Sequence, residues 1–339
     1  MPTYLLKFLK NILRGAAQRQ DKSHLVSEDI VETDTTSELP DEPAEPVDQT
    51  IAASVDTEAE VFELIADPHW VPSLPTTQFF ETTAGKSSRR IAYTVSGNMQ
   101  ANKILLCLPG LLETKNSFTV LHAYFLRFSE CKVISVDFSG RGESDVLAPD
   151  EQYKMSVYLS DISQFIESAI LVKGDKKPRL TILGTSMGGV LAMYLAQRFR
   201  SKIYEIILND IALTVNWTSL YSLYKSMNNV TGYSEVRDLA QELSVDQRAI
   251  TDVQLPTHFD LTYRADVWGM NFHAALEQFK GRVALIYGGE SKICTKRRVN
   301  EAKASIPSLR VCEVPGAGHP APFDLKVCAF IQDEMGVKG

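Results

Sequence analysis

Residues 180–199 read LTILGTSMGGVLAMYLAQRF, in which an apolar, strand-like run passes through a glycine-rich turn into a helix-like run. A serine on such a sharp strand-to-helix turn is pushed out of the sheet, and the glycines beside it permit the tight backbone. The start of the helix also offers a backbone amide, that of Met187, to an oxyanion that develops beside the serine. The pattern G-x-S-x-G alone is weak evidence, because it occurs by chance in about one chain in ten of this length. Its place between a strand and a helix makes Ser186 a candidate nucleophile.

From about residue 77 to the end, the chain alternates strand-like and helix-like runs. This order is typical of a largely parallel sheet with helices on both faces. The predicted strands read TQFFET, RRIAYTVSG, KILLCLPG, CKVISVDF, RLTILG, YEIILND, RVALIYGG and LRVCEVPG. The sequence therefore predicts an α/β fold whose mostly parallel, eight-stranded sheet is flanked by helices.

Residues 214–278 interrupt this alternation between the sixth and seventh strands. Their pattern is helical, and they hold many tyrosine, tryptophan and phenylalanine residues. We interpret them as an inserted helical cap, with residues 77–213 and 279–339 forming the core. The aromatic residues offer surface for an apolar acyl group, although packing inside the cap would also explain them.

Two segments of opposite charge precede the core. Residues 1–20 have the pattern of a short basic amphipathic helix, which can lie in an anionic membrane surface. An organelle presequence and a helix docked on the protein's own body are the alternatives. Residues 21–76 are acidic and rich in proline, so we predict a largely disordered linker. An acidic flap over the mildly basic body is the alternative to a solvated linker.

Composition limits the function classes further. The net charge is −7, and no cluster of basic residues resembles a nucleic-acid-binding surface. The chain has no apolar run of eighteen residues and no pattern of a secretory signal, so we expect a cytoplasmic protein, in which residues 1–20 give possible contact with a membrane surface. Five cysteines without close spacing predict buried, reduced thiols, not disulfides or a zinc site.

A histidine loop follows the last predicted strand, with the sequence PGAGHP at residues 315–320. His319 lies 133 residues after Ser186, so only the fold can bring the two side chains together. A loop histidine at this place is suited to accept the serine proton as a general base. The other histidines have no partner that the sequence identifies.

Two further loops follow buried strands. In LPGLLETKNSF, residues 108–118, the glycine lets the backbone turn so that the Leu111 amide can act as a second oxyanion donor. An ordinary strand-ending turn explains the same residues. In VDFSGRGES, residues 136–144, we interpret Asp137 and Arg141 as residues that brace a loop and do not touch substrate.

These motifs, in this order over some 250 residues, resemble the α/β-hydrolase superfamily, and within it the cap-bearing serine hydrolases with a GTSMGG turn. LCLPGL is similar to their oxyanion loop, VDFSGRGESD to their G-R-G-x-S loop, ILNDIAL to the segment after their sixth strand and PGAGHP to their histidine loop. The resemblance implies Ser186 as nucleophile, His319 as base, and Leu111 and Met187 as oxyanion amides. It implies no metal or organic cofactor.

The sequence departs from the family pattern at two places. Pro109 stands where the family usually has a histidine, and Lys292, in GGESK, stands where its aspartate usually lies. The acid of a triad orients the imidazole and stabilises the imidazolium, so another carboxylate is needed. Asp210, after the sixth strand, and Glu290, in the original turn, are both candidates.

The sequence thus predicts a serine hydrolase that cleaves a carboxylic ester or related acyl bond of a small-molecule substrate through an acyl-enzyme. The alternatives are a non-catalytic binding protein with the same fold, and a thioesterase or C–C bond hydrolase. The sequence does not separate these activities, because the shared residues act on the carbonyl group and the cap selects the leaving group.

Overall fold

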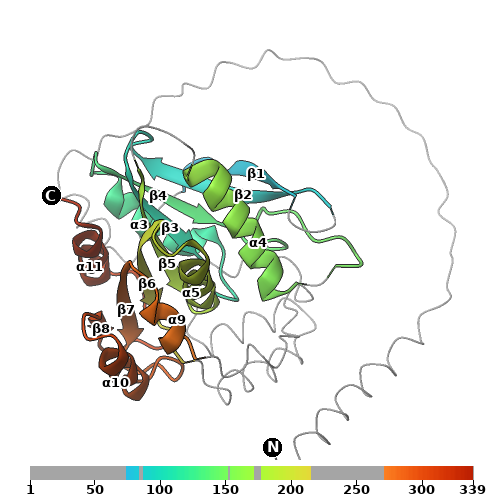
Figure 1. Cartoon of the computed structure of the whole chain (residues 1–339). Helices are drawn as coiled ribbons and strands as arrows, with labels where there is room; N and C mark the ends of the chain where they lie inside the picture. Colours follow the sequence, from blue (N-terminus) through green and yellow to red (C-terminus); the bar gives the residue numbers. More distant parts are fainter. Residues whose placement is uncertain (1–73, 84–86, 152, 172–176, 215–270, 339) are drawn as a thin grey trace, which may run out of the picture. The chain divides into compact units, whose positions relative to one another are not determined.

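The computed structural model describes residues 74–83, 87–151, 153–171, 177–214 and 271–338 (Figure 1). The predicted helix at 1–20, almost all of the predicted linker at 21–76 and residues 215–270 of the predicted cap lie outside the described residues and stay predictions. No helix within the described part of the chain is long and apolar enough to cross a membrane.

The eight predicted strands are confirmed, and together they form one sheet. They are β1 (Gln78–Thr82), β2 (Arg89–Gly97), β3 (Lys103–Leu108), β4 (Cys131–Val136), β5 (Arg179–Thr185), β6 (Ile203–Asn209), β7 (Arg282–Gly288) and β8 (Arg310–Val314). The order across the sheet is β1-β2-β4-β3-β5-β6-β7-β8, and β2 runs antiparallel to both of its neighbours. The neighbours from β4 to β8 are parallel, so these strands end at one common edge.

Helices cover both faces of the sheet (Figure 1). One face packs against α3 (Thr119–Phe125), which follows the 3-10 turn η1 (Lys115–Phe118), and α11 (Leu325–Met335). The other packs against α4 (Met155–Phe165), its π-helical extension η2 (Ile166–Ile170), α5 (Met187–Phe199), α9 (His273–Glu277) and α10 (Lys296–Ser305). The predicted α/β layers are therefore present.

Strand β3 shows why the central strands read as nearly continuous apolar runs. Ile104 and Leu106 pack into the core that contains α4 and α5, whereas Leu105 and Cys107 pack into the core under α3 and α11. A strand that is covered on both faces needs apolar residues at successive positions, not only at alternate ones. Burial of each such leucine or isoleucine contributes roughly 1.5–3 kcal/mol to stability.

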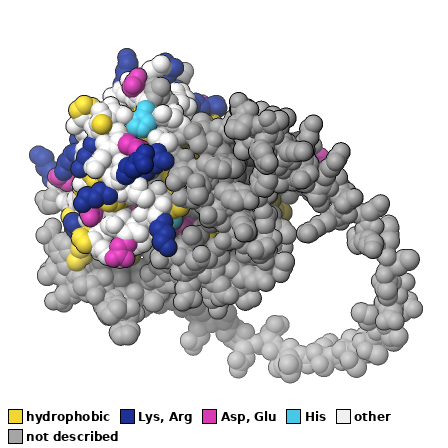
Figure 2. All heavy atoms as spheres, turned by 90° about the horizontal axis from the view of Figure 1, so that it is seen from below, with side chains coloured by type: hydrophobic (Ala, Val, Ile, Leu, Met, Phe, Trp, Pro, Cys, Tyr) yellow, Lys and Arg dark blue, Asp and Glu magenta, His cyan; other side chains and the backbone are white. Residues whose placement is uncertain are grey.

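Helix α10 illustrates the opposite case, a helix that covers an edge of the core and faces solvent. Val299 and Ala302 are its buried residues. On its outer side, Arg297 and Arg298 both pair with Glu301, at 2.9 and 3.1 Å. Seen from below, the described surface carries lysine and arginine side chains with acidic side chains among them (Figure 2).

All five cysteines are buried free thiols, as predicted. Thr214, the first residue of the predicted cap, forms an isolated antiparallel bridge with Asn271, so the two described segments that flank residues 215–270 meet at one place. Helix α9, which follows this bridge, packs against α5, and the rings of Phe272 and Tyr194 meet edge to face at 5.2 Å.

Candidate active site

Ser186 lies on the turn between β5 and α5, at the edge where the parallel strands end. Its backbone angles are φ 48° and ψ −110°, a conformation that is rare for a residue with a side chain. Two hydrogen bonds hold the turn: the Ser186 amide donates to the Asn209 carbonyl at 2.9 Å, and the Gly189 amide donates to the Ser186 carbonyl at 2.9 Å. Strained backbone of this kind persists only where the surrounding structure fixes it, and it concentrates at functional sites.

A glycine is required at position 188, because α5 begins directly against the end of β3. A Cβ atom at Gly188 would lie 2.2 Å from the backbone oxygen of Leu108. This close approach places the first turn of α5, with Met187 as its first residue, beside the loop that follows β3. The amino end of a helix carries a partial positive charge, which favours a negative charge beside it.

The structure brings His319 to both Ser186 and Asp210. The imidazole Nε2 lies 3.0 Å from the Ser186 hydroxyl oxygen, and Nδ1 lies 2.7 Å from Oδ2 of Asp210. Ser186, His319 and Asp210 thus form a hydrogen-bonded array. The His319 side chain is 13% exposed and that of Asp210 is fully buried, so Ser186 lies at the outer end of this array. These three residues come from the ends of β5, β6 and β8, which explains how a spacing of 133 residues closes to hydrogen-bond distance.

Asp210 is held firmly at the end of β6. Its amide donates to the Ile286 carbonyl at 2.7 Å, and the Gly288 amide donates to its Oδ1 at 3.3 Å. A buried carboxylate requires such donors, because it loses its hydration. Burial, and secondly the negative charge of Asp210, raise the pKa of the Cys294 thiol, so this neighbour stays neutral.

Glu290, the other candidate acid, lies in the turn after β7 and is exposed. Its backbone contacts the histidine loop, because its amide donates to the Ala317 carbonyl at 2.9 Å. Lys292 is also exposed in this turn. Of the two carboxylates that the sequence leaves open, the structure therefore places Asp210 at the imidazole, and Lys292 does not occupy that place.

The two candidate oxyanion residues lie at neighbouring strand ends. Leu108, the last residue of β3, pairs with Gly184 of β5. Leu111 follows the first of these strands by three residues and Met187 follows the second by two, so both backbone amides lie at the edge that carries Ser186. The side chains of both residues are buried.

A buried ion cluster, which sequence analysis did not identify, fixes the loops around the site. The Asp137 carboxylate accepts from the Lys115 amide at 2.7 Å, from the Lys115 ammonium at 2.8 Å and from the Glu143 amide at 3.0 Å. Burial would lower the pKa of Lys115, but the carboxylates of Asp137 and Glu143 outweigh burial and raise it. The interpretation of Asp137 as a loop brace agrees with these contacts.

Asn209 is a second residue with a role that sequence analysis missed. Its side-chain amide donates to the Ala321 carbonyl at 3.0 Å, and its own carbonyl accepts from the Ser186 amide. It thus ties the histidine loop and the serine turn to the end of β6. The position of Asn209 directly before Asp210 was the feature of the sequence that could have indicated its role. For Lys115, the corresponding feature was a charged residue in the loop that follows a buried strand.

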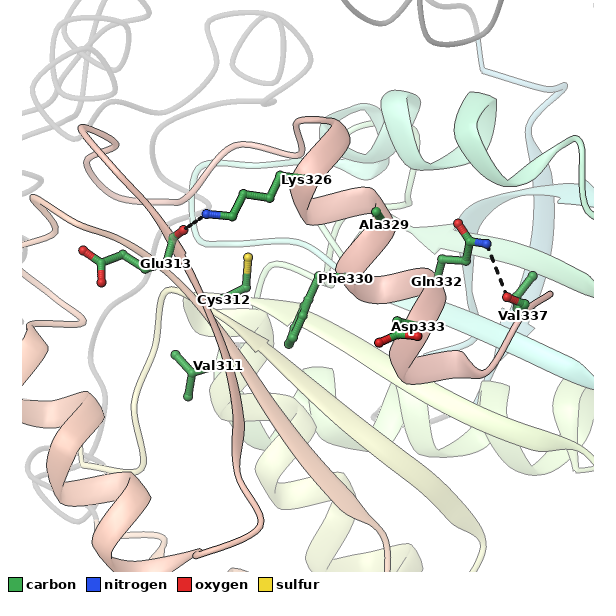
Figure 3. A pocket seen from close by; sticks show the side chains of 9 residues that line it. All are labelled: Val311, Cys312, Glu313, Lys326, Ala329, Phe330, Gln332, Asp333 and Val337. Atoms are coloured by element: carbon green, nitrogen blue, oxygen red, sulfur yellow. Dashed lines mark hydrogen bonds between the residues drawn. The ribbon is translucent and has the colours of Figure 1, made fainter. Parts of the chain in front are cut away.

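A groove of about 540 Å³ lies between β8 and α11 (Figure 3). Phe330 of α11 and Val311 of β8 line it, and the Lys326 ammonium donates to the Glu313 carbonyl across its rim at 2.7 Å. None of Ser186, Asp210 and His319 lines this groove, so it is not the substrate site of the array described above.

Comparison with known proteins gives relatives of one fold. A family model described as alpha/beta hydrolase fold matches residues 103–232. The chain is 22% identical over 286 residues to 3-hydroxybutyrate-oligomer hydrolase of Cupriavidus necator, which covers 74% of this chain and 93% of that protein.

Solved structures agree with this match. An alpha/beta hydrolase from Novosphingobium aromaticivorans has a TM-score of 0.60 and 20% identity, covering 77% of this chain and 98% of its own. E-2-(acetamidomethylene)succinate hydrolase also has a TM-score of 0.60, with 18% identity over 77% of this chain and all of its own. The chain therefore has the α/β-hydrolase fold.

Proposed function

We propose that this protein is a serine hydrolase that cleaves a carboxylic ester or a related acyl bond through an acyl-enzyme. The observation that carries the proposal is the continuous array of Asp210, His319 and Ser186, joined at 2.7 and 3.0 Å on a strained strand-to-helix turn. A nucleophile, a base that it can reach and a third group that orients the base are the signature of covalent catalysis.

In the first step, Ser186 Oγ forms a bond to the substrate carbonyl carbon while His319 Nε2 takes the hydroxyl proton. The carbonyl electron pair moves to oxygen, and the amides of Leu111 and Met187 donate hydrogen bonds to that oxyanion. Asp210 accepts a hydrogen bond from Nδ1, which keeps the neutral imidazole in the tautomer that can accept at Nε2 and stabilises the imidazolium that forms.

In the second step, the bond from the carbonyl carbon to the leaving group breaks and the imidazolium gives its proton to the leaving alcohol. Water then attacks the acyl-enzyme, and His319 takes a proton from it. Collapse of the second tetrahedral intermediate releases the acid and returns the proton to Ser186. Each step uses the same two side chains in alternating roles.

The relatives suggest which substrates to test first. The Cupriavidus necator relative acts, by its name, on oligomers of 3-hydroxybutyrate, and such oligomers of a hydroxy acid are joined by ester bonds. Oligo-esters and simple acyl esters of increasing length are therefore the first panel. Matched thioesters belong in the same panel, because serine attack on the carbonyl group is shared and the leaving group differs.

A fluorophosphonate probe tests the proposal directly, since it phosphonylates an activated serine. We expect labelling of the wild-type protein, no labelling of Ser186→Ala and strongly reduced labelling of His319→Ala. Ser305→Ala, which changes an exposed serine on α10, is the matched control and should label like wild type. If the wild type neither labels nor hydrolyses any member of the panel, the non-catalytic binding protein replaces this proposal.

A further inference from the structure

We propose that Arg141 and Glu113 together position the oxyanion hole by holding Gly110 at both its amide and its carbonyl group. The inference rests on the proposed hydrolase function and adds two positioning residues to it. Neither residue needs to touch substrate: both act through the backbone of the loop that follows β3.

The contacts at Gly110 fix two successive peptide groups. The Gly110 amide donates to Oε2 of Glu113 at 2.6 Å. The Gly110 carbonyl oxygen accepts from Nη1 of Arg141 and from the Glu113 amide, each at 3.3 Å. Both side chains are almost completely buried, Glu113 at 4% exposure and Arg141 at 1%, so water does not compete for these hydrogen bonds.

The geometry of the peptide bond links the Gly110 carbonyl to the candidate oxyanion donor. The Gly110 carbonyl and the Leu111 amide belong to the same planar trans peptide group, in which C=O and N–H point in opposite directions. When Arg141 holds the Gly110 oxygen on its side of the loop, the Leu111 N–H is held toward the other side. Gly110 has no side chain that would restrict this rotation, so its orientation depends on external contacts.

The Arg141 side chain is itself held rigidly. Its guanidinium lies 5.5 Å from the ring centre of Tyr158 and 6.0 Å from that of Phe138, and its Nη2 donates to the Tyr158 hydroxyl at 3.4 Å. Stacking on aromatic rings and a forked set of donors are properties that lysine does not share.

Glu113 and Arg141 form a clamp on Gly110, and the loops that carry these two residues are also joined to each other. Lys115 lies two residues after Glu113, and its amide donates to Asp137 at 2.7 Å at the start of the loop that carries Arg141. Hydrogen bonds between buried groups therefore link the loop after β3 to the loop after β4. A donor that is preorganised in this way spends no energy on reorientation when the oxyanion forms.

Arg141→Lys keeps the positive charge but removes the planar guanidinium group and its several N–H donors. We therefore expect kcat to fall by about 10- to 100-fold, with KM little changed. This effect is smaller than the roughly 10²- to 10³-fold that follows from removal of an oxyanion donor, because the Leu111 amide is still present. Glu113→Ala should show the same pattern. Glu113→Gln keeps an acceptor for the Gly110 amide and should restore most of the activity. Arg282→Lys, at the amino end of β7 and so at the opposite edge of the sheet, is the matched control.

The inhibition constant of a trifluoromethyl ketone, which forms an anionic tetrahedral adduct with the serine, separates positioning from a loss of stability. It should rise in proportion to the loss of kcat in Arg141→Lys and Glu113→Ala, and stay unchanged in Arg282→Lys. Hydrogen exchange of residues 108–118 should accelerate in the first two variants, at a temperature where urea unfolding shows all of them folded.

Two outcomes overturn the inference in different ways. If Ser186→Ala is inactive but Arg141→Lys and Glu113→Ala match wild type in kcat and ketone affinity, the clamp is wrong and the proposed function stands. If the wild type hydrolyses no ester and binds no ketone, the proposed function fails, and a clamp for an oxyanion fails with it.

Discussion

The imidazole Nδ1 of His319 lies 2.7 Å from Oδ2 of Asp210, the residue that directly follows β6. The turn after β7, where a hydrolase of this type more often carries its acid, presents the exposed Lys292. Because β6 and β7 are adjacent and parallel, their ends lie side by side, and a carboxylate from either strand can reach the same imidazole. In this protein β6, which is adjacent to β5, supplies the carboxylate that contacts His319.

Asp210→Asn should therefore abolish most of the turnover. The amide keeps the shape of the side chain but offers an N–H where Nδ1 needs an acceptor, so the imidazole is no longer held in the productive tautomer. We expect a loss of about 10⁴-fold in kcat, as in a triad where this change leaves the geometry intact. Steady-state hydrolysis of the best ester in the panel measures it.

Glu290→Gln is the matched control, because it makes the same chemical change at an exposed carboxylate in the turn after β7. Its kcat should remain close to that of wild type. Equal losses in the two variants, or a larger loss in Glu290→Gln, would contradict the assignment of Asp210 and favour a carboxylate from the β7 turn.

Gly188→Ala should disrupt the site and the fold together. The new Cβ would lie 2.2 Å from the Leu108 oxygen, a backbone atom that cannot move without separating α5 from β3. We expect a loss of about 3 kcal/mol or more in the free energy of unfolding, at the upper end for overpacking, together with loss of serine labelling.

Gly316→Ala is the comparison for this change, because no atom lies within 4 Å of its Cβ position and only its φ of 72° opposes a side chain. A cost of about 1–2 kcal/mol is expected there. Urea unfolding measures both variants, and a similar cost for the two would mean that the contact with Leu108 is not the cause.

Because of His122, we expect the free energy of unfolding to decrease in acid. Its ring lies buried between the hydroxyls of Ser96 and Ser135, at 2.7 and 2.9 Å. Burial lowers its pKa from 6.5 to about 3. Between these pH values the imidazole is protonated in the unfolded chain and neutral in the folded protein. The contribution is fully present above pH 6.5 and decreases as the pH falls, by about 2 kcal/mol at pH 5 and about 4 kcal/mol near pH 3.

His122→Gln removes this titration and keeps a polar group between the two serines. Urea unfolding of both proteins at several pH values from 7.5 to 5 gives the test, because other groups cancel in the difference. The stability of wild type relative to the variant should decline across this range as the pH is lowered. A difference that does not depend on pH would show that His122 is not neutral in the folded protein.

Glu205, which lies in β6, should give the opposite dependence of stability on pH. Its carboxyl is fully buried, and Arg282 lies 2.9 Å from it. Burial, and secondly the adjacent carboxyl group of Glu334, raise the pKa of Glu205 above its usual value of 4.5, so the folded protein binds this proton more tightly than the unfolded chain does. The contribution of this group to stability should therefore decrease as the pH rises above 4.5.

Glu205→Gln removes the proton and leaves an isosteric side chain beside Arg282. The variant should gain stability relative to wild type between pH 5 and pH 8. Glu301→Gln is the control: the hydrogen bond from Arg297 lowers the pKa of Glu301 from 4.5, so it titrates below this window and should give no slope. If Glu205→Gln and Glu301→Gln behave alike, Glu205 is ionised in the folded protein.

Much of the fold follows from local patterns. The eight strands were predictable because each is an apolar run between glycine, proline or charged residues, and because strands covered on both faces need such runs. The turn that carries Ser186 and the loop that carries His319 were also recognisable, since their glycines satisfy backbone requirements that act over a few residues.

Other features depend on contacts between distant parts of the chain. The pair of Lys115 and Asp137, the histidine between Ser96 and Ser135, and the buried Glu205 all place charged or titratable groups in the core. No local pattern distinguishes such residues from solvated ones, because what stabilises them is a partner from another strand or helix.

The sequence alone determined the strand series, the serine on its turn and the histidine after the last strand, since each is encoded within a short window by backbone geometry and burial. It left two carboxylates open for the imidazole. Only the tertiary structure decided between them, because the distance from His319 to Asp210 is set by the order of β6, β7 and β8 in the sheet and by the packing of the loops at their ends. Those distances join residues that are 109 positions apart, and no pattern along the chain contains them.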